Sequence, residues 1–309
     1  MSILKTIYVV NVPTKEAINI LKHMNTKNEI IKLLKKCEEH YELFKNKEIV
    51  LDQIKKKYVV KQSIPILFFG DIEEYFSSKI KIVTAALNPS DKEFIDEDSK
   101  PIDRFPEKNK KDNNYTALKN YFKKKNNPYR DWFDESFEPI LEGIKSSYYS
   151  DKKGFSNRAI HTDICSPLAT SPTWTDLNKD NRKDADKLKK VGQEIWKELI
   201  EIIKPDIILV SVEEKIKEEI LGENKTIFWD SKSNAERNNH QDLTTNDKPR
   251  VETYKVYIND YPIKSGKKTK IIWGKANRKP FMNLDYNSDR KPRVKLGEYI
   301  FENLDSLGL

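Results

Sequence analysis

Two short stretches of this 309-residue chain combine polar residue types that bind and react with ligands. In the first, residues 86–94, an apolar run stops at the Asn-Pro turn of Leu87-Asn88-Pro89-Ser90. In the stretch 161–174, His161 and Asp163 occupy alternate positions of a predicted strand, so both side chains point to the same face. An ordinary turn and a loop-capping carboxylate would give the same patterns. The two stretches are therefore candidates for a catalytic or ligand-binding loop.

A third stretch, 274–283, is a basic loop that follows another apolar run ending at Gly274. A surface turn is one interpretation. The other is a wedge that enters a nucleic-acid groove, with Phe281 at its tip and with Arg278 and Lys279 on phosphates.

The elements that must position these stretches are short β-branched runs at 64–70, 80–87, 159–167, 206–212 and 269–274. Runs that are apolar on both faces are typical of a parallel sheet buried under helices. A helix lies between two of them, because apolar residues recur every three or four positions from Leu188 to Ile202. We expect an α/β fold, a three-layer α/β/α sandwich with a central, mostly parallel sheet. Ligands bind outside the carboxyl ends of such strands, where all three stretches fall.

Two segments fall outside this pattern. Residues 1–61 are expected to form an N-terminal helical appendage, with one face made of Ile30, Leu34, Cys37, Tyr41 and Phe44. Residues 62–309 form the predicted catalytic domain, which contains a polar insertion around 222–268 with a strand-like end.

The net charge of +8 is unevenly distributed. Residues 101–130 hold nine Lys and Arg against three acids, and residues 264–295 hold eleven against two. Two basic segments on an otherwise acidic chain indicate a polyanion groove, although a Lys- and Asn-rich composition alone would also produce them. The aromatic residues among these cations favour nucleic acid, because bases stack on rings while Lys and Arg bind phosphates.

Composition also excludes some classes. The apolar runs are far shorter than the roughly 20 residues of a membrane-spanning helix. Cys37 and Cys165 alone cannot make a four-cysteine metal or iron–sulfur site. No signal-peptide pattern opens the sequence. We expect a cytoplasmic monomer without metal or cofactor.

Together, the three stretches resemble the uracil-DNA glycosylase-like superfamily over about residues 62–309. Leu87-Asn88-Pro89-Ser90 looks like the first motif of the iron–sulfur-free branches that use Asn, such as the single-strand-selective and mismatch-specific enzymes. The stretch from His161 to Pro167 looks like the strand whose end reads a flipped base. Residues 277–281 look like the loop that presses into the minor groove, with Asn-Arg-Lys-Pro in place of the usual His-Pro-Ser or Asn-Pro-Ser.

The resemblance implies roles for individual residues. Asn88 would orient the attacking water, and Asn277 would stabilise negative charge on the departing base. Phe105 would stack on the base, with Phe94 as the alternative. Base binding would also involve His161 and Asp163. DNA would contact a further set: Ser90, Arg104, Lys275, Arg278, Lys279 and Phe281. The absence of a suitably placed lysine predicts hydrolysis without strand cleavage.

One departure from the family pattern bears on the base. Uracil readers carry an Asn amide where this chain has Asp163. An ionised carboxylate only accepts hydrogen bonds, so it suits the N4 amino group of cytosine and repels O4 of uracil. A one-residue shift that places Thr162 there, or a protonated Asp163, would remove this distinction.

The sequence therefore predicts a monofunctional DNA glycosylase that flips a modified pyrimidine out of the stack and hydrolyses its N-glycosidic bond. Hypermodified cytosine in phage DNA is the favoured substrate, as in antiphage glycosylases whose abasic products defend the cell. The alternatives are a uracil-DNA repair glycosylase and a non-catalytic module that binds DNA or a modified base.

Overall fold

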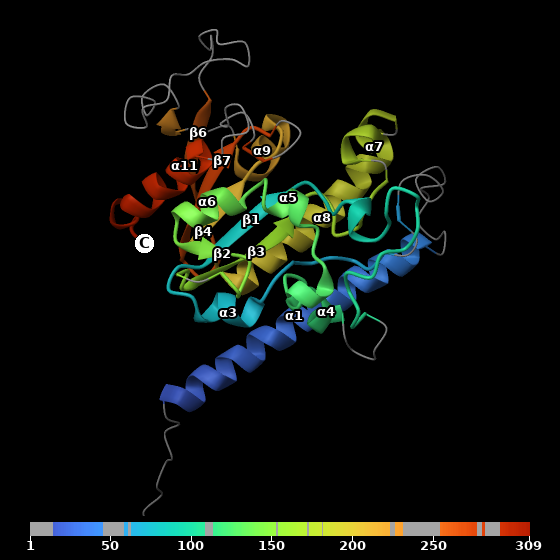
Figure 1. The fold of residues 1–309 in the computed structure, drawn as a ribbon, viewed down its shortest axis with the longest axis horizontal. Helices are drawn as coiled ribbons and strands as arrows, with labels where there is room; N and C mark the ends of the chain where they lie inside the picture. The colour runs from blue at the N-terminus through green and yellow to red at the C-terminus, as the bar shows by residue number, and fades with distance from the viewer. Residues whose placement is uncertain are drawn as a thin grey trace, which may run out of the picture.

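The computed structural model describes residues 15–45, 59–60, 63–108, 114–152, 154–171, 173–180, 182–222, 226–230, 254–276, 280–281 and 291–309. Within these ranges a single seven-stranded sheet has helices on both faces (Figure 1). This architecture confirms the predicted α/β fold with a mostly parallel central sheet.

The strands follow the order β2-β3-β1-β4-β7-β6-β5 across the sheet. Their bounds are β1 (Ile82–Ala86), β2 (Ser146–Ser147), β3 (Asn157–Asp163), β4 (Ile207–Val210), β5 (Thr226–Asp230), β6 (Lys255–Pro262) and β7 (Lys268–Gly274). Strands β2, β3, β1, β4 and β7 run parallel to one another, whereas β6 and β5 are antiparallel. The central strands β1 and β4 are buried along their whole length, as their uninterrupted apolar runs predict.

The predicted strand at 64–70 is wrong. Within this segment only Phe69 forms an isolated β-bridge, which is antiparallel and pairs it with His161 of β3. Pro65 has no N–H to donate to a ladder. At the other end, Gly70 turns the chain with a φ of 114° into helix α3 (Ile72–Ser77), which is capped by Asp71. The segment is nevertheless buried, so its apolar character reflects the core and not a strand.

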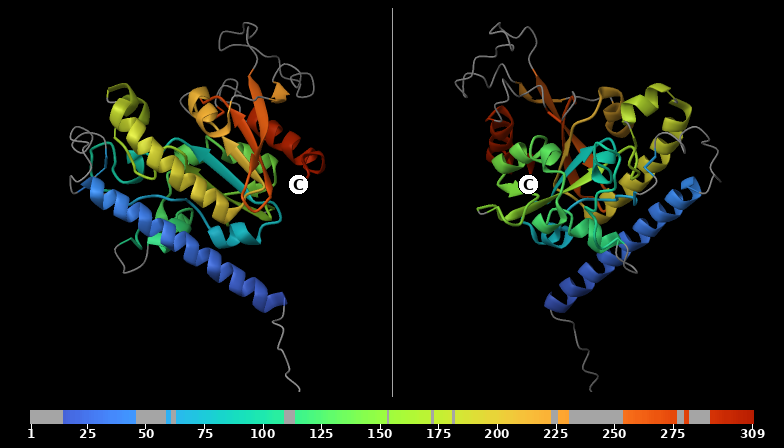
Figure 2. Two further views of the ribbon diagram at one scale, coloured as in Figure 1. Left: turned by 180° about the vertical axis from the view of Figure 1, so that it is seen from behind. Right: turned by 45° about the vertical axis from the view of Figure 1, so that its right-hand side comes forward.

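The helices form two layers. Helix α8 (Arg182–Ile203) lies behind the sheet, with α1 (Lys15–Lys45) packed outside it (Figure 2). The opposite face carries α5 (Arg130–Phe133) and α6 (Glu138–Gly143), and α6 packs against α11 (Lys291–Glu302). The remaining helices are short: α4 (Asn114–Lys119), α7 (Trp174–Asp180), α9 (Glu214–Leu221) and the 3₁₀ turns Asp91–Glu93, Lys124–Asn126 and Asp305–Leu307.

Helix α1 belongs to the same core. Its predicted apolar face is buried at Ile30, Leu34, Cys37 and Tyr41, whereas the side chain of Phe44 lies outside the described residues. An ion pair of 2.5 Å between Lys36 and Glu198 also links α1 to α8. No helix in the described ranges is both long and apolar enough to cross a bilayer.

The predicted insertion around 222–268 contributes to the sheet at both of its described ends. β5 pairs with β6, and β6 pairs along its length with β7. Residues 231–253, between these strands, lie outside the described part of the chain.

Candidate functional site

The site forms where the order of the strands reverses. From β1 the chain moves to β3 on one side and then crosses to β4 on the other. Loops that leave adjacent strands in opposite directions open a crevice at their carboxyl ends. Asp163 is the last residue of β3 and lies opposite Ala86 of β1. Asn88 follows Ala86 by two residues. The sheet therefore brings the first two candidate stretches together.

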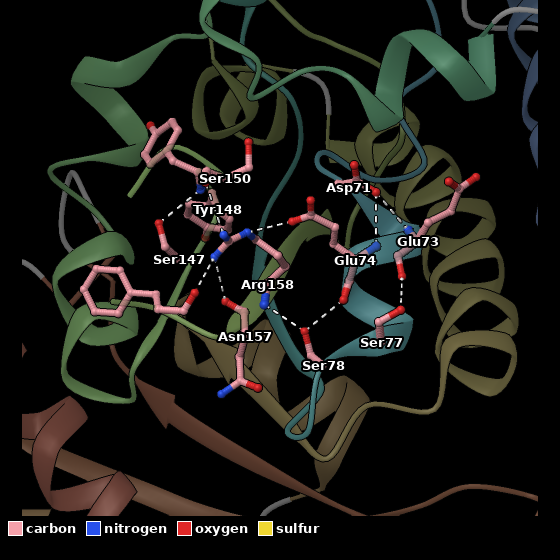
Figure 3. A network of polar contacts seen from close by, with 12 residues as sticks. Asp71, Glu73, Glu74, Ser77, Ser78, Ser147, Tyr148, Ser150, Asn157 and Arg158 are labelled. Carbon is pink, nitrogen blue, oxygen red and sulfur yellow. Dashed lines mark hydrogen bonds and ion pairs between the residues drawn. The ribbon is translucent and has the colours of Figure 1, made fainter. Parts of the chain in front are cut away.

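A polar network holds the amino end of β3 (Figure 3). The Arg158 guanidinium donates from Nε to Glu74 Oε2 at 2.8 Å, and its backbone N–H donates to Ser78 Oγ, also at 2.8 Å. The side-chain oxygen of Asn157 accepts from the backbone N–H of Lys79 at 3.1 Å. These contacts fasten β3 to α3, so the strand that ends in Asp163 has a fixed position.

An inner cavity of about 60 Å³ lies at the end of β1 and β3. A water molecule needs about 10–15 Å³ of such space, so this cavity accepts a flat chemical group but not a nucleotide. It is lined by Phe69, Asn88, Pro89, Ser90, Glu93, Tyr129, Trp132, Phe133, His161 and Asp163. The lining thus combines aromatic rings with two carboxyl groups and one amide.

Asp163 lacks a hydrogen-bond partner. The residue is 7% exposed, and neither carboxylate oxygen accepts a hydrogen bond in the described part of the chain. The closest ring nitrogen, His161 Nε2, lies 3.6 Å from Asp163 Oδ1. An unpaired buried carboxylate is costly, so a ligand with hydrogen-bond donors would relieve a penalty already present in the fold.

His161 is held in place by contacts inside the protein. Its Nδ1 lies 2.7 Å from Thr84 Oγ1, which is itself 2.5 Å from the hydroxyl of Tyr148. Thr162 lies on the other face of the strand, where its Oγ1 accepts from Trp196 Nε1 at 3.1 Å. The side chain of Asp163, and not that of Thr162, therefore faces the cavity.

The Asn88 side chain is held through its amide nitrogen. The amide nitrogen donates to Thr170 Oγ1 and to the Pro89 carbonyl, both at 2.9 Å, and to the Leu168 carbonyl at 3.4 Å. Asn88 Oδ1 has no hydrogen bond in the described residues. The loop after β3 thus orients the amide so that its acceptor is available to a water or a ligand.

Glu93 is a second buried carboxyl in the inner cavity, only 3% exposed. Burial raises its pKa from 4.5 to about 7, and the charge on Asp163 adds to the rise. A hydrogen bond from the Tyr121 hydroxyl to Glu93 Oε2 and the Arg104 guanidinium, 4.0 Å away, lower the pKa. Near neutral pH this carboxyl therefore exists in both protonation states.

Two predicted contacts with the substrate are structural instead. Arg104 is 8% exposed and donates inward, from Nε to the Lys92 carbonyl at 3.2 Å and from Nη1 to the Asn127 carbonyl. Phe105 is fully buried, and its ring stacks on Phe94 at 5.3 Å. Neither Phe105 nor Phe94 is among the residues that line the inner cavity, because both are buried in the hydrophobic core. Half-buried Tyr129 and Trp132 face the inner cavity in their place.

An outer cavity of about 370 Å³ adjoins the inner one. The two share Asn88, Pro89, Ser90, Tyr129 and Trp132. The outer cavity is further lined by Ala86, Leu87, Thr170, Thr173, Trp174, Thr175, Ser211, Glu213, Ala276 and Pro280. Ser90 belongs to this shared wall, where its hydroxyl accepts from the Lys92 N–H and donates to Asp91.

The structure describes the third stretch only in part. Ala276 and Pro280 line the outer cavity and Lys275 is exposed beside it, whereas Asn277, Arg278 and Lys279 lie outside the described residues. The predicted wedge residue Phe281 is fully buried. Its N–H donates to Ser211 Oγ at 3.0 Å and its ring packs edge-on against Phe137, so its role is to anchor this loop to the core.

The second basic segment does not form one surface. Because β7 runs parallel to β4, residues 264–270 lie at its amino end, where Lys267 pairs with Asp206 at 2.5 Å. Lys275 follows the carboxyl end of β7 and is exposed beside Ala276 of the outer cavity. A lateral cavity of about 370 Å³ instead places cations beside the outer cavity, with which it shares Trp174 and Glu213. Its cationic lining is Lys179, Arg182, Lys189 and Lys215.

Some site residues were missed from sequence although a signal was present. Glu93 lies five residues after Asn88, within the first stretch. Tyr129 lies in the first basic segment and Trp132 just after it, among the aromatic residues of that region. Thr170 carries no such signal, because its contact with Asn88 depends on how two loops pack.

The described residues contain no group of three or more His, Cys, Asp or Glu side chains arranged to hold a metal ion. Comparisons with protein-family models, with curated proteins and with solved structures found no match to this chain.

Proposed function

We propose that the protein is a monofunctional DNA glycosylase that extrudes a pyrimidine nucleotide and hydrolyses its N-glycosidic bond. The observation that carries this proposal is that one cavity holds the carbonyl oxygen of Asn88 and the carboxylate of Asp163, which accept no hydrogen bond from the described residues. The first suits a water molecule that attacks the sugar. The second suits the edge of a base.

Each of the two cavities suits a different part of the proposed substrate. The inner cavity takes the polar edge of the base, with Tyr129 and Trp132 available for stacking. The outer cavity leaves room for the sugar and for a bulky substituent on the base. Exposed Lys179 and Lys215 of the lateral cavity and Lys275 would attract the DNA backbone.

Asp163 favours a cytosine-type base. A carboxylate accepts from the N4 amino group of cytosine and is repelled by O4 of uracil. Because excision of ordinary cytosine would damage the genome, we propose a modified cytosine, such as the hypermodified cytosine of phage DNA, and hence a role in phage defence.

The test is release of base from oligonucleotides that carry uracil, cytosine or glucosylated hydroxymethylcytosine, in single strands and duplexes, read as abasic sites. We expect release of the modified cytosine only. Asn88→Ala should abolish release and leave salt-dependent DNA binding nearly intact. Asn28→Ala, at an exposed asparagine of α1, is the matched control.

The other outcomes discriminate between functions. Release of uracil without release of modified cytosine would identify a repair enzyme and refute the choice of base. DNA binding without abasic sites on any substrate would refute catalysis and leave a binding module.

A further inference from the structure

The inner cavity holds two carboxyl groups in different surroundings. Asp163 accepts no hydrogen bond from the described residues, whereas Glu93 accepts one from Tyr121 at Oε2. Glu93 Oε1 has no hydrogen-bond partner there. Both side chains are more than nine-tenths buried, and both line the same 60 Å³ of space.

Glu93 has one permanent positive charge among its described neighbours, the Arg104 guanidinium. The groups around it are Arg104 at 4.0 Å, the hydroxyl of Tyr121, the phenol of Tyr129 and Asp163, and the imidazole of His161 lines the same cavity 3.6 Å from Asp163. Two buried carboxyls that line one cavity disfavour ionisation of both at once, and burial favours the protonated form of Glu93.

The proposed reaction needs such a proton. Electrons of the broken C1′–N1 bond pass to the departing base, whose edge would lie against the Asp163 carboxylate. In a buried cavity, an anionic base next to a fixed negative charge is strongly disfavoured. Departure of the base as a neutral molecule removes this repulsion.

We propose that Glu93 is the general acid of this site and transfers its proton to the departing base. This inference rests on the proposed glycosylase function. As the C1′–N1 bond breaks, its electron pair goes to the base, the Glu93 proton moves to a ring nitrogen or the O2 oxygen, and Glu93 becomes a carboxylate. The water held by Asn88 adds to C1′ and releases a proton to solvent, from which Glu93 is reprotonated. One water is consumed for each base released.

The experiment measures single-turnover base release against pH for the wild type, Glu93→Gln and Tyr121→Phe. The wild-type rate should fall as pH rises through about 7, the pKa of this buried carboxyl. Glu93→Gln should be slower by on the order of 10²–10⁴-fold and should lose this dependence. Tyr121→Phe removes a hydrogen bond that stabilises the carboxylate, so its profile should shift toward higher pH.

A second readout uses the 6-aza form of the same base, which keeps the substituent at C5 and leaves more easily without a proton. It should restore much of the rate of Glu93→Gln and change the wild type less. An equal loss at every pH and on both bases would overturn the acid role while base release by the wild type still supports the glycosylase. Failure of the wild type to release any base would overturn both.

Discussion

Replacement of Glu93 by glutamine should change the pH dependence of folding stability, whatever the substrate. The folded state favours the neutral carboxyl, because burial raises its pKa from 4.5 to about 7. Its contribution to stability is therefore complete below pH 4.5 and is lost as pH rises through 7. A shift of this size corresponds to roughly 3 kcal/mol of unfolding free energy.

Urea unfolding at pH 5 and pH 8 measures this effect. Between the two conditions the wild type should lose roughly 2–3 kcal/mol of unfolding free energy relative to Glu93→Gln. The amide can still accept the Tyr121 hydrogen bond, so the comparison isolates the ionisation. Glu29→Gln, at an exposed glutamate of α1, is the matched control and should leave the pH dependence unchanged. If wild type and Glu93→Gln differ by the same amount at both pH values, Glu93 does not titrate in this range and the reasoning is refuted.

Three further variants test the site and its supports. Thr170→Val removes the acceptor that orients Asn88, so kcat for base release should fall roughly three- to tenfold with KM unchanged; an unaltered kcat would contradict this role. In Gly192→Ala, the new Cβ would lie 2.1 Å from the Cys165 carbonyl oxygen in the loop after β3. This clash should lower the free energy of unfolding in urea by about 1–3 kcal/mol. Lys190→Ala, at an exposed position of the same helix, should leave it unchanged. Phe105→Ala should cost about 3–5 kcal/mol in the same assay, and a loss below 1 kcal/mol would argue against a core position.

The sequence predicted the core of the fold because buried parallel strands leave a direct trace in it. The runs at 80–87, 159–167, 206–212 and 269–274 all contain strands of the sheet. The general rule that ligands bind at the carboxyl ends of such strands was sufficient to pair Asn88 with Asp163. The run at 64–70 misled because a buried segment next to a helix cap has the same composition as a strand.

Residue type predicts less about which side chains face a ligand. Arg104, Phe105 and Phe281 have the right chemistry for DNA or base contacts, but tertiary packing directs all three inward. Charge runs are equally ambiguous. The basic segment 264–295 begins before β7 and continues after it. Only the direction of β7 in the sheet determines that residues 264–270 lie far from the site.

In the proposed glycosylase, the anchoring of Arg158 to α3 bears on discrimination between bases. These contacts hold the start of β3, which limits how far the Asp163 carboxylate at its end can move away from a mismatched base. Selection then operates by exclusion, since a base that offers no donor leaves a desolvated negative charge uncompensated. A rigidly held carboxylate of this kind would select strictly at the edge of the base. It would accept different substituents only where they project into the outer cavity.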